Sequence, residues 1–221
     1  MENLFSVLSG CPLFADIDRA DLGPLLDCLG AKRIQVRKNQ VILAEGDPAR
    51  YVGVVLEGSV RIEKVDYYGN RSIMAQAQPG ELFAESFACA GSATMPVSAV
   101  AASDGQIMLV DCQRITVSCS NACGFHSRLI GNLLRIVAFK NIQLNQKIEL
   151  TGKRTTREKL LAYLTGQAKH RGSDSFTIPF DRQALADYLQ VERSAMSAEI
   201  SKLRKEGILE SKKNYFRLLK Q

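Results

Sequence analysis

The residues best suited to bind a metal or react with an oxidant are concentrated in the stretch CSNACGFH. Cys119, Cys123 and His126 lie within eight residues, and on a helix the two cysteines would share one face with His126 a turn further on. Thiolate and imidazole are ligands of zinc, iron–sulfur clusters and haem. The spacing fits no standard zinc motif and a fourth ligand is not evident. Structural packing, redox-active thiols and a metal site therefore all stay open.

A second candidate site is the stretch GELFAESFACAGSATMPVSAVAA, from Gly80 to Ala102. It combines a glycine turn, one acid (Glu85) and small side chains, as in the wall of a small-molecule pocket. No Lys or Arg occurs between Arg71 and Arg114. An anion buried there would lack a local countercharge, which carries a large desolvation penalty. A neutral or apolar ligand, or no ligand, fits this uncharged pocket better.

Charge is divided unevenly along the chain. The net charge is +6; residues 1–150 hold 14 Lys and Arg against 15 Asp and Glu (14 − 15 = −1), and residues 151–221 hold 15 against 8 (15 − 8 = +7). A basic C-terminal region on a near-neutral body indicates a polyanionic partner such as nucleic acid. The simpler alternative is a solvated basic surface.

The sequence shows no sign of catalysis, of a disulfide scaffold or of membrane insertion. With only two histidines and no nucleophile–base motif or phosphate-binding glycine loop, we predict that the protein is not an enzyme. Six cysteines in 221 residues do not indicate a disulfide scaffold. We find neither a long apolar span nor a signal peptide, and we predict a cytoplasmic protein with no membrane partner.

Four segments with different periodicity must position these residues. Residues 1–30 have helical spacing, with Asp18 as a predicted N-cap. Residues 31–111 contain short β-type runs separated by glycine turns, which indicate a β-roll or barrel, and DYYGN marks a hairpin. Residues 120–150 return to a helical period. From 151 onward the pattern predicts a helix ended by Gly172, a short strand, two helices, the first of them capped by Asp181, and a terminal hairpin.

The long helical segment carries a heptad seam. Its apolar positions follow 4-3-4-3-4 spacing, and one polar residue, Asn141, lies in the seam. A buried Asn there costs stability but fixes register and partner number. We predict a parallel dimer seam, the alternative being a helix packed only on its own β-roll. The seam residues are Ile130, Leu134, Val137, Asn141, Leu144 and Ile148.

The two C-terminal helices and the basic hairpin predict a winged helix-turn-helix. Leu185, Ala186 and Leu189 give the first helix an apolar face, and Met196, Ile200 and Leu203 give one to the second. Arg193 lies near the N-terminus of the second helix, the end that enters the major groove, where it could pair with guanine. Other cations lie within reach of backbone phosphates. The predicted DNA-binding residues are Arg182, Gln183, Arg193, Ser194, Ser197, Ala198, Lys202, Lys212 and Lys213.

The order of these segments resembles the family of the cyclic AMP receptor protein and the fumarate-nitrate reductase regulator. The resemblance is carried by the motifs PLF, EGD, EGSV, GELFAE and RSAMSAEISKLRKEGIL. The resemblance covers essentially the whole chain. It implies an α+β fold with a cyclic-nucleotide-binding-like β-roll at residues 1–118, a dimerisation helix at 119–150 and a winged helix-turn-helix at 151–221. It also implies a homodimeric bacterial transcription factor in which a signal at the β-roll and long helix modulates DNA binding.

The sequence departs from the family pattern in its effector site. Glu85 matches the glutamate that takes the ribose in cyclic AMP binders, but the positions of the phosphate-binding Arg-Ser pair fall on Met95 and Pro96. Pro96 has no N–H to donate, and Met95 has no charge. The predicted effector-pocket residues are Glu85, Ser86, Met95 and Pro96, and we predict that cyclic AMP is not the effector. The alternatives for Glu85 are a surface acid and a helix-capping acid.

The DNA-reading helix also departs from the pattern. The position of the family's second arginine falls on Ala198, so one potential base contact is lost. A good bidentate contact discriminates between bases by about 1–3 kcal/mol, and we therefore expect the operator to differ from the family's best-known site at that position. Glu192 is a weak N-cap, and Gln190 would cost roughly 1 kcal/mol if its turn is left-handed.

We therefore expect a regulator that binds a palindromic operator as a homodimer and contacts RNA polymerase, with redox or metal sensing as further options. The competing hypothesis is a sensor with the cyclic-nucleotide-binding fold that acts through protein contacts.

Overall fold

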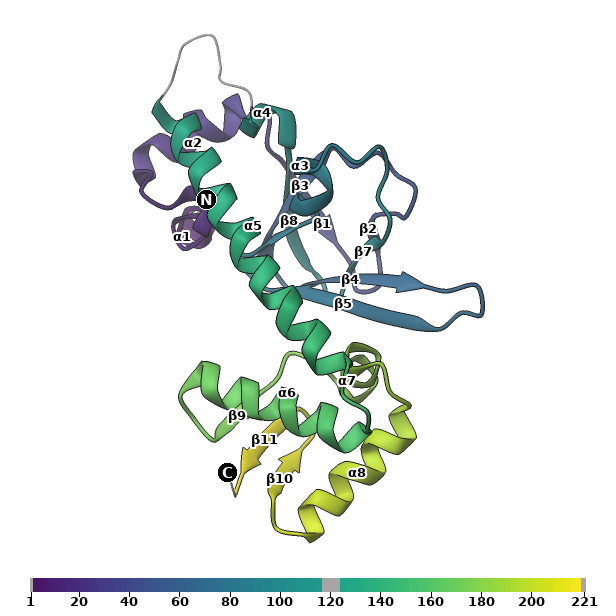
Figure 1. The fold of residues 1–221 in the computed structure, drawn as a ribbon. Helices are drawn as coiled ribbons and strands as arrows, with labels where there is room; N and C mark the ends of the chain where they lie inside the picture. Colours follow the sequence, from purple (N-terminus) through teal and green to yellow (C-terminus); the bar gives the residue numbers. More distant parts are fainter. Residues whose placement is uncertain (1, 117–123, 220–221) are drawn as a thin grey trace. The chain divides into compact units, whose positions relative to one another are not determined.

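The computed structural model describes residues 2–116 and 124–219 (Figure 1). The chain divides into two compact units. The first contains the residues up to 66 together with 74–141, and the second contains 67–73 together with the residues from 142 onward. No helix among the described residues is both long enough and apolar enough to cross a membrane.

The N-terminal segment is helical, as predicted. It forms α1 (Glu2–Ser9), the 3₁₀ helix η1 (Pro12–Phe14) and α2 (Arg19–Cys28). Asp18 occupies the N-cap position of α2, but its side chain makes no capping hydrogen bond. Leu8, Leu13 and Leu22 pack in the interior of the first unit.

The predicted β-roll is confirmed as two four-stranded sheets. One has the strand order β1-β8-β3-β6 and the other β2-β7-β4-β5. Their bounds are β1 (Lys32–Val36), β2 (Val41–Leu43), β3 (Tyr51–Glu57), β4 (Val60–Val65), β5 (Arg71–Ala77), β6 (Leu82–Phe83), β7 (Ser98–Ala101) and β8 (Gly105–Asp111). The DYYGN segment connects the neighbouring strands β4 and β5, as the hairpin signal predicts.

Glycine at position 53 allows close packing inside the roll. A Cβ atom on Gly53 would lie 2.0 Å from the ring of Phe83, which pairs with it across β3 and β6. Any larger residue would displace that ring, and since Phe83 is fully buried, the core would have to repack. The interior of the roll is filled by side chains such as Phe83, Met95 and Ile107.

Two short helices interrupt the β pattern. α3 spans Glu85–Cys89 and α4 spans Cys112–Thr116. The sequence did not predict them, because five residues are too few to establish a helical period against the β-type runs on either side. Ala84 starts α3 from the left-handed region with φ +62°.

The long helix α5 spans Gly124–Thr151. Leu129 and Leu133 lie on a face that is buried in the interior of the first unit. Leu134 is 70% exposed, and Ile130, Leu144 and Ile148 are also exposed. The face that packs within the unit is therefore different from most of the predicted seam, although Val137 packs partly against the interior.

The second unit has the element order predicted for its sequence. It contains α6 (Thr156–Arg171), β9 (Ser175–Thr177), α7 (Arg182–Leu189), α8 (Arg193–Lys205), β10 (Leu209–Lys212) and β11 (Tyr215–Leu218). The three strands form an antiparallel sheet in the order β10-β11-β9. A capping box between Thr155 and Glu158 starts α6, and Gly172 at φ +60° ends it.

Candidate functional site

The turn between α7 and α8 has the geometry that the sequence predicted. Asp181 caps α7 by accepting a hydrogen bond from the Ala184 N–H at 2.8 Å. Gln190 ends α7 in the left-handed region, with φ +54° and ψ +56°. Glu192 stands at the N-cap of α8 without a side-chain capping bond, so it is the weak cap that its residue type indicates.

Each helix buries the face that was predicted. Leu185, Ala186 and Leu189 of α7 are fully buried, and so are Met196 and Leu203 of α8, while Ile200 is nearly so. Ala186 is small enough to let the two helices approach closely. Because both apolar faces are used inside this unit, the opposite face of α8 is left to solvent.

That solvent face carries most of the predicted DNA-binding residues. On α8, Arg193, Ser194, Ala198 and Lys202 are exposed and Ser197 is half-buried. Lys212 and Lys213 are exposed at the β10–β11 turn, where Lys213 adopts φ +53°. The structure therefore brings a basic hairpin tip and a helix with short polar side chains into one unit, as in a winged helix-turn-helix.

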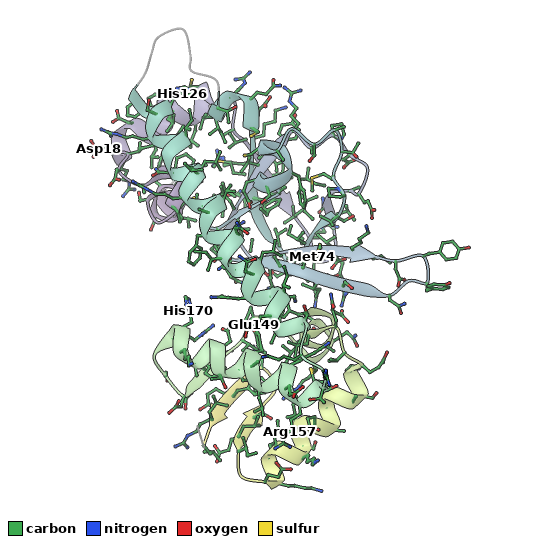
Figure 2. The ribbon with its side chains drawn as sticks, viewed as in Figure 1. Asp18, Met74, His126, Glu149, Arg157 and His170 are labelled. Atoms are coloured by element: carbon green, nitrogen blue, oxygen red, sulfur yellow. The ribbon has the colours of Figure 1, made fainter. Side chains whose placement is uncertain are left out.

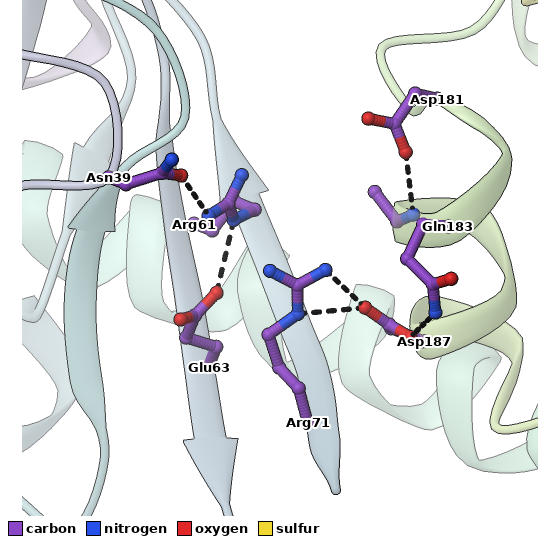
Figure 3. A network of polar contacts seen from close by, with 8 residues as sticks. Asn39, Arg61, Glu63, Arg71, Asp181, Gln183 and Asp187 are labelled. Atoms are coloured by element: carbon purple, nitrogen blue, oxygen red, sulfur yellow. Dashed lines mark hydrogen bonds and ion pairs between the residues drawn. The ribbon is translucent and has the colours of Figure 1, made fainter. Parts of the chain in front are cut away.

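Two of the predicted DNA-binding residues have partners within the protein. The Arg182 guanidinium lies over the Phe216 ring, 4.8 Å from its centroid, and donates to the Ser211 hydroxyl at 3.3 Å. Burial lowers the pKa of Arg182. The Gln183 amide donates to the Asp187 carboxylate at 2.7 Å (Figure 3). Asp187 also accepts from Arg71 Nε at 2.7 Å, so this carboxylate is well satisfied. These contacts give Arg182 and Gln183 a structural role.

Arg157, which sequence reasoning missed, holds α8 against α6. Its guanidinium lies 3.0 Å from the Glu199 carboxylate and 2.6 Å from that of Glu206 (Figure 2). Glu199 lies at the middle of α8 and Glu206 at its C-cap, so neither belongs to the N-terminal turn that carries Arg193. Since the partners are 42 and 49 residues apart in the chain, no local motif could have indicated this clamp.

The effector-site residues lie in the first unit, and the structure corrects the expectation of an uncharged site. Glu85, the first residue of α3, is only 2% exposed. It is therefore not the surface acid that was one alternative. Lys140 of α5 places its ammonium 2.9 Å from the Glu85 carboxylate and 2.6 Å from the Leu82 carbonyl oxygen. The cation absent from the neighbouring sequence comes from the long helix.

The other three effector-site residues do not lie together in the interior. Met95 is 1% exposed and packs in the core of the roll. Pro96 and Ser86 are exposed, and the Ser86 hydroxyl donates to the second Glu85 oxygen at 3.1 Å. Thus both oxygens of Glu85 have partners from this chain, and Met95 occupies the interior as an apolar core residue.

Only His126 of the predicted metal candidates can be placed. Its ring is buried, and Nε2 lies 3.1 Å from the Arg114 carbonyl oxygen; Figure 2 labels it on α5. Cys119 and Cys123 lie outside the described residues. Across residues 2–116 and 124–219 there is no cluster of three or more metal-binding side chains.

Comparison with known proteins gives two matches to family models. The cyclic nucleotide-binding domain model matches residues 33–117, and the Crp-like helix-turn-helix domain model matches residues 158–220. The first range covers nearly all of the β-roll, and the second contains α7 and α8.

Individual relatives agree with this assignment. The nitrogen fixation regulation protein FixK of Bradyrhizobium diazoefficiens is 24% identical over 183 residues, which cover 80% of this chain and 74% of that protein. The structure of FixK2 from Bradyrhizobium japonicum is similar with a TM-score of 0.69 and 25% identity, over 86% of this chain and 93% of that one. The c-di-GMP-responsive regulator CLP of Xanthomonas campestris shares the fold, with a TM-score of 0.75 at 16% identity over 92% and 100% of the two chains.

Proposed function

The chain belongs to the Crp/Fnr family of transcriptional regulators, and from this membership we propose that it binds a palindromic operator as a homodimer and responds to a signal other than cyclic AMP. Its relatives are regulators rather than enzymes. The exposed N-terminal turn of α8, which carries Arg193, is the observation that most directly supports operator recognition.

Dimerisation is supported by the exposed apolar side chains of α5. Ile130, Leu134, Leu144 and Ile148 repeat at heptad positions, and each is at least 39% exposed in the single chain. Such a stripe is buried when two helices pair. Replacing Leu134 and Ile148 by Asp should convert the dimer to a monomer in analytical ultracentrifugation. Gln146→Asp, at an exposed position off the seam, is the matched control. A double variant that sediments like the wild-type protein would refute this interface.

Operator recognition is supported by the division of α8 into a buried apolar face and an exposed polar face. Two such helices in a symmetric dimer would read half-sites about one helical turn apart. Arg193→Ala should reduce affinity for the selected operator by about 10- to 100-fold, from about 1–3 kcal/mol per bidentate contact. Its affinity for random DNA should change much less. The operator can be obtained by selection from a random DNA library.

The same experiment tests the competing hypothesis of a sensor that acts through protein contacts. If selection enriches no sequence, or if Arg193→Ala binds DNA as the wild-type protein does, the competing hypothesis is favoured. If the operator lies in promoters, a dimer bound there in the bacterial cytoplasm is positioned to contact RNA polymerase, and in vitro transcription would measure that contact.

A signal other than cyclic AMP is supported by the environment of Glu85 and Met95. The Glu85 carboxylate is already held by Lys140, and Met95 lies in the packed interior where the phosphate-binding arginine would be needed. A buried phosphate diester with no free cation is strongly disfavoured. Isothermal titration should detect no micromolar binding of cyclic AMP, or of c-di-GMP, the ligand to which CLP responds. Saturable micromolar binding of either would refute the proposal.

Metal or redox sensing at Cys119, Cys123 and His126 stays a prediction. Metal analysis of protein purified without oxygen tests the metal option directly, with His126→Ala as the variant that should lose any bound iron or zinc.

A further inference from the structure

Two cysteines outside the predicted metal site lie in direct contact. Cys89 is the last residue of α3, and Cys112 is the first residue of α4. Their Sγ atoms are 3.3 Å apart and share a hydrogen bond. A disulfide has an S–S length of about 2.05 Å, so the two sulfur atoms need to approach each other by only about 1.3 Å.

The two thiols differ in exposure and acidity. Cys89 is exposed and Cys112 is buried. The hydrogen bond with Cys89 lowers the pKa of the Cys112 thiol, and the same contact raises the pKa of Cys89. Hence the pair, once it has lost one of its two protons, shares the other between two sulfur atoms, one of which solvent can reach. Thiolate character combined with access is the condition for reaction with oxidants.

The other cysteines among the described residues lack this arrangement. Cys11 is buried, and burial raises its pKa to about 11, which leaves an inert thiol in the core. Cys28 is exposed, and within residues 2–116 and 124–219 its thiol makes no hydrogen bond to another cysteine.

We propose that Cys89 and Cys112 are a reversible redox modification site, which a hydroperoxide converts to an intramolecular disulfide. The shared hydrogen bond favours the proton on Cys89, so Cys89 reacts from the minor form in which that proton has passed to Cys112. In that form the exposed sulfur is the thiolate, and it attacks one peroxide oxygen. The O–O bond breaks, the Cys89 sulfur is oxidised to a sulfenic acid, and the peroxide is reduced to hydroxide, which takes the proton from Cys112 to form water. The Cys112 thiolate then attacks the Cys89 sulfur and displaces hydroxide, which leaves as a second water after protonation. Overall, two thiols and one hydrogen peroxide give one disulfide and two waters.

The position of the pair connects it to the effector site. α3 carries Glu85 at its first residue and Cys89 at its last, and Lys140 of α5 holds Glu85. The disulfide would tie the other end of this short helix to α4. An effect of oxidation on operator affinity rests on the proposed function, whereas formation of the disulfide does not.

Peptide mapping of the full chain tests the chemistry. The reduced protein, freed of reductant, is treated with hydrogen peroxide, alkylated and digested for mass spectrometry. We expect a peptide linked through Cys89 and Cys112, a decrease of two from the six thiols of the chain, and full reversal by dithiothreitol. Operator binding of the oxidised and reduced protein is then compared by fluorescence anisotropy.

Variants make the result specific. Cys89→Ser, at an exposed position, should abolish the linked peptide, and Cys112→Ser should leave Cys89 as a sulfenic acid that dimedone traps. Cys28→Ser is the control, because it removes an exposed cysteine and should keep the link. The proposal is overturned if wild-type Cys112 is alkylated after Cys89 has been oxidised, or if Cys112 is instead linked to Cys119 or Cys123. A linked peptide without any change in DNA affinity would confirm the site and separate it from regulation of operator binding.

Discussion

The buried pair of Glu85 and Lys140 should contribute measurably to the stability of the first unit. Lys140→Met keeps an apolar side chain of similar length but removes the ammonium. Glu85 would then be an almost fully buried carboxylate whose side-chain partner, among the residues that the structure describes, is the Ser86 hydroxyl alone. Breaking a buried ion pair by removing one partner costs about 3–5 kcal/mol. Because the Lys140 side chain is 33% exposed, we expect the lower end, about 3 kcal/mol.

The reverse substitution should cost less. In Glu85→Gln, the Lys140 stem can turn its ammonium toward water or keep its bond to the Leu82 carbonyl oxygen. We expect a loss of about 1 kcal/mol. In the double variant no charge is left buried. Its free energy of unfolding should therefore fall by about 2 kcal/mol less than the sum of the two single decreases, which is within the usual range for contacting residues.

The measurement must isolate the first unit, because a chain with two units need not unfold in one step. Urea unfolding followed by pulsed hydrogen exchange, read on peptides from β3, gives the free energy of unfolding of that unit. Lys64→Met is the control, because Lys64 Nζ lies 4.0 Å from Glu45 Oε1 and the two side chains are 53% and 48% exposed. This substitution should lower the free energy of unfolding by less than about 0.5 kcal/mol. The reasoning is refuted if Lys140→Met is as mild as this control, or if the two single effects simply add.

Three further predictions concern the second unit. Asp181→Ala removes the cap of α7 and should cost about 1 kcal/mol, whereas Asp181→Asn should retain most of it; thermal unfolding distinguishes the two. Gln190→Gly should raise the midpoint of thermal unfolding because glycine adopts the left-handed region without strain. Gln190→Val should lower the free energy of unfolding by about 1–2 kcal/mol, and the midpoint with it; equal midpoints would contradict the strain assigned to this turn. Burial, with the nearby charge of Lys159, lowers the pKa of Lys147 to about 7, against about 10.4 in an unfolded chain. Between these values the unfolded chain binds more protons, so the free energy of unfolding should rise as pH increases from 7 toward 10, and urea unfolding of Lys147→Met should show a smaller rise.

Local patterns predicted the second unit well. The cap at Asp181, the left-handed Gln190 and the buried positions Met196, Ile200 and Leu203 all depend on residues within a few positions of one another. Helix ends and helix faces are set by such short spacings. For the same reason the β-roll was visible as strands and glycine turns, although the pairing order of its strands was not.

Contacts between distant segments were not predictable. Lys140 and Glu85 are 55 residues apart, and the sequence around Glu85 indicates only that a local cation is missing. The apolar face with Leu129 and Leu133 does continue to Lys140 at helical spacing, so its position toward the roll could have been inferred, but its partner could not. Arg157 gave no signal at all, since a surface Arg on a helix has no preferred partner in the sequence.

The Arg157 clamp has a consequence for how such a regulator can change its target over evolutionary time. Arg157, Glu199 and Glu206 fix the orientation of α8 together with its buried apolar residues. The positions that face solvent near the start of the helix, such as Ser194 and Ala198, belong neither to these ion pairs nor to the buried apolar face. Mutations there can alter which DNA bases are favoured at almost no cost in folding, so the stability of this unit and its sequence preference can be selected independently.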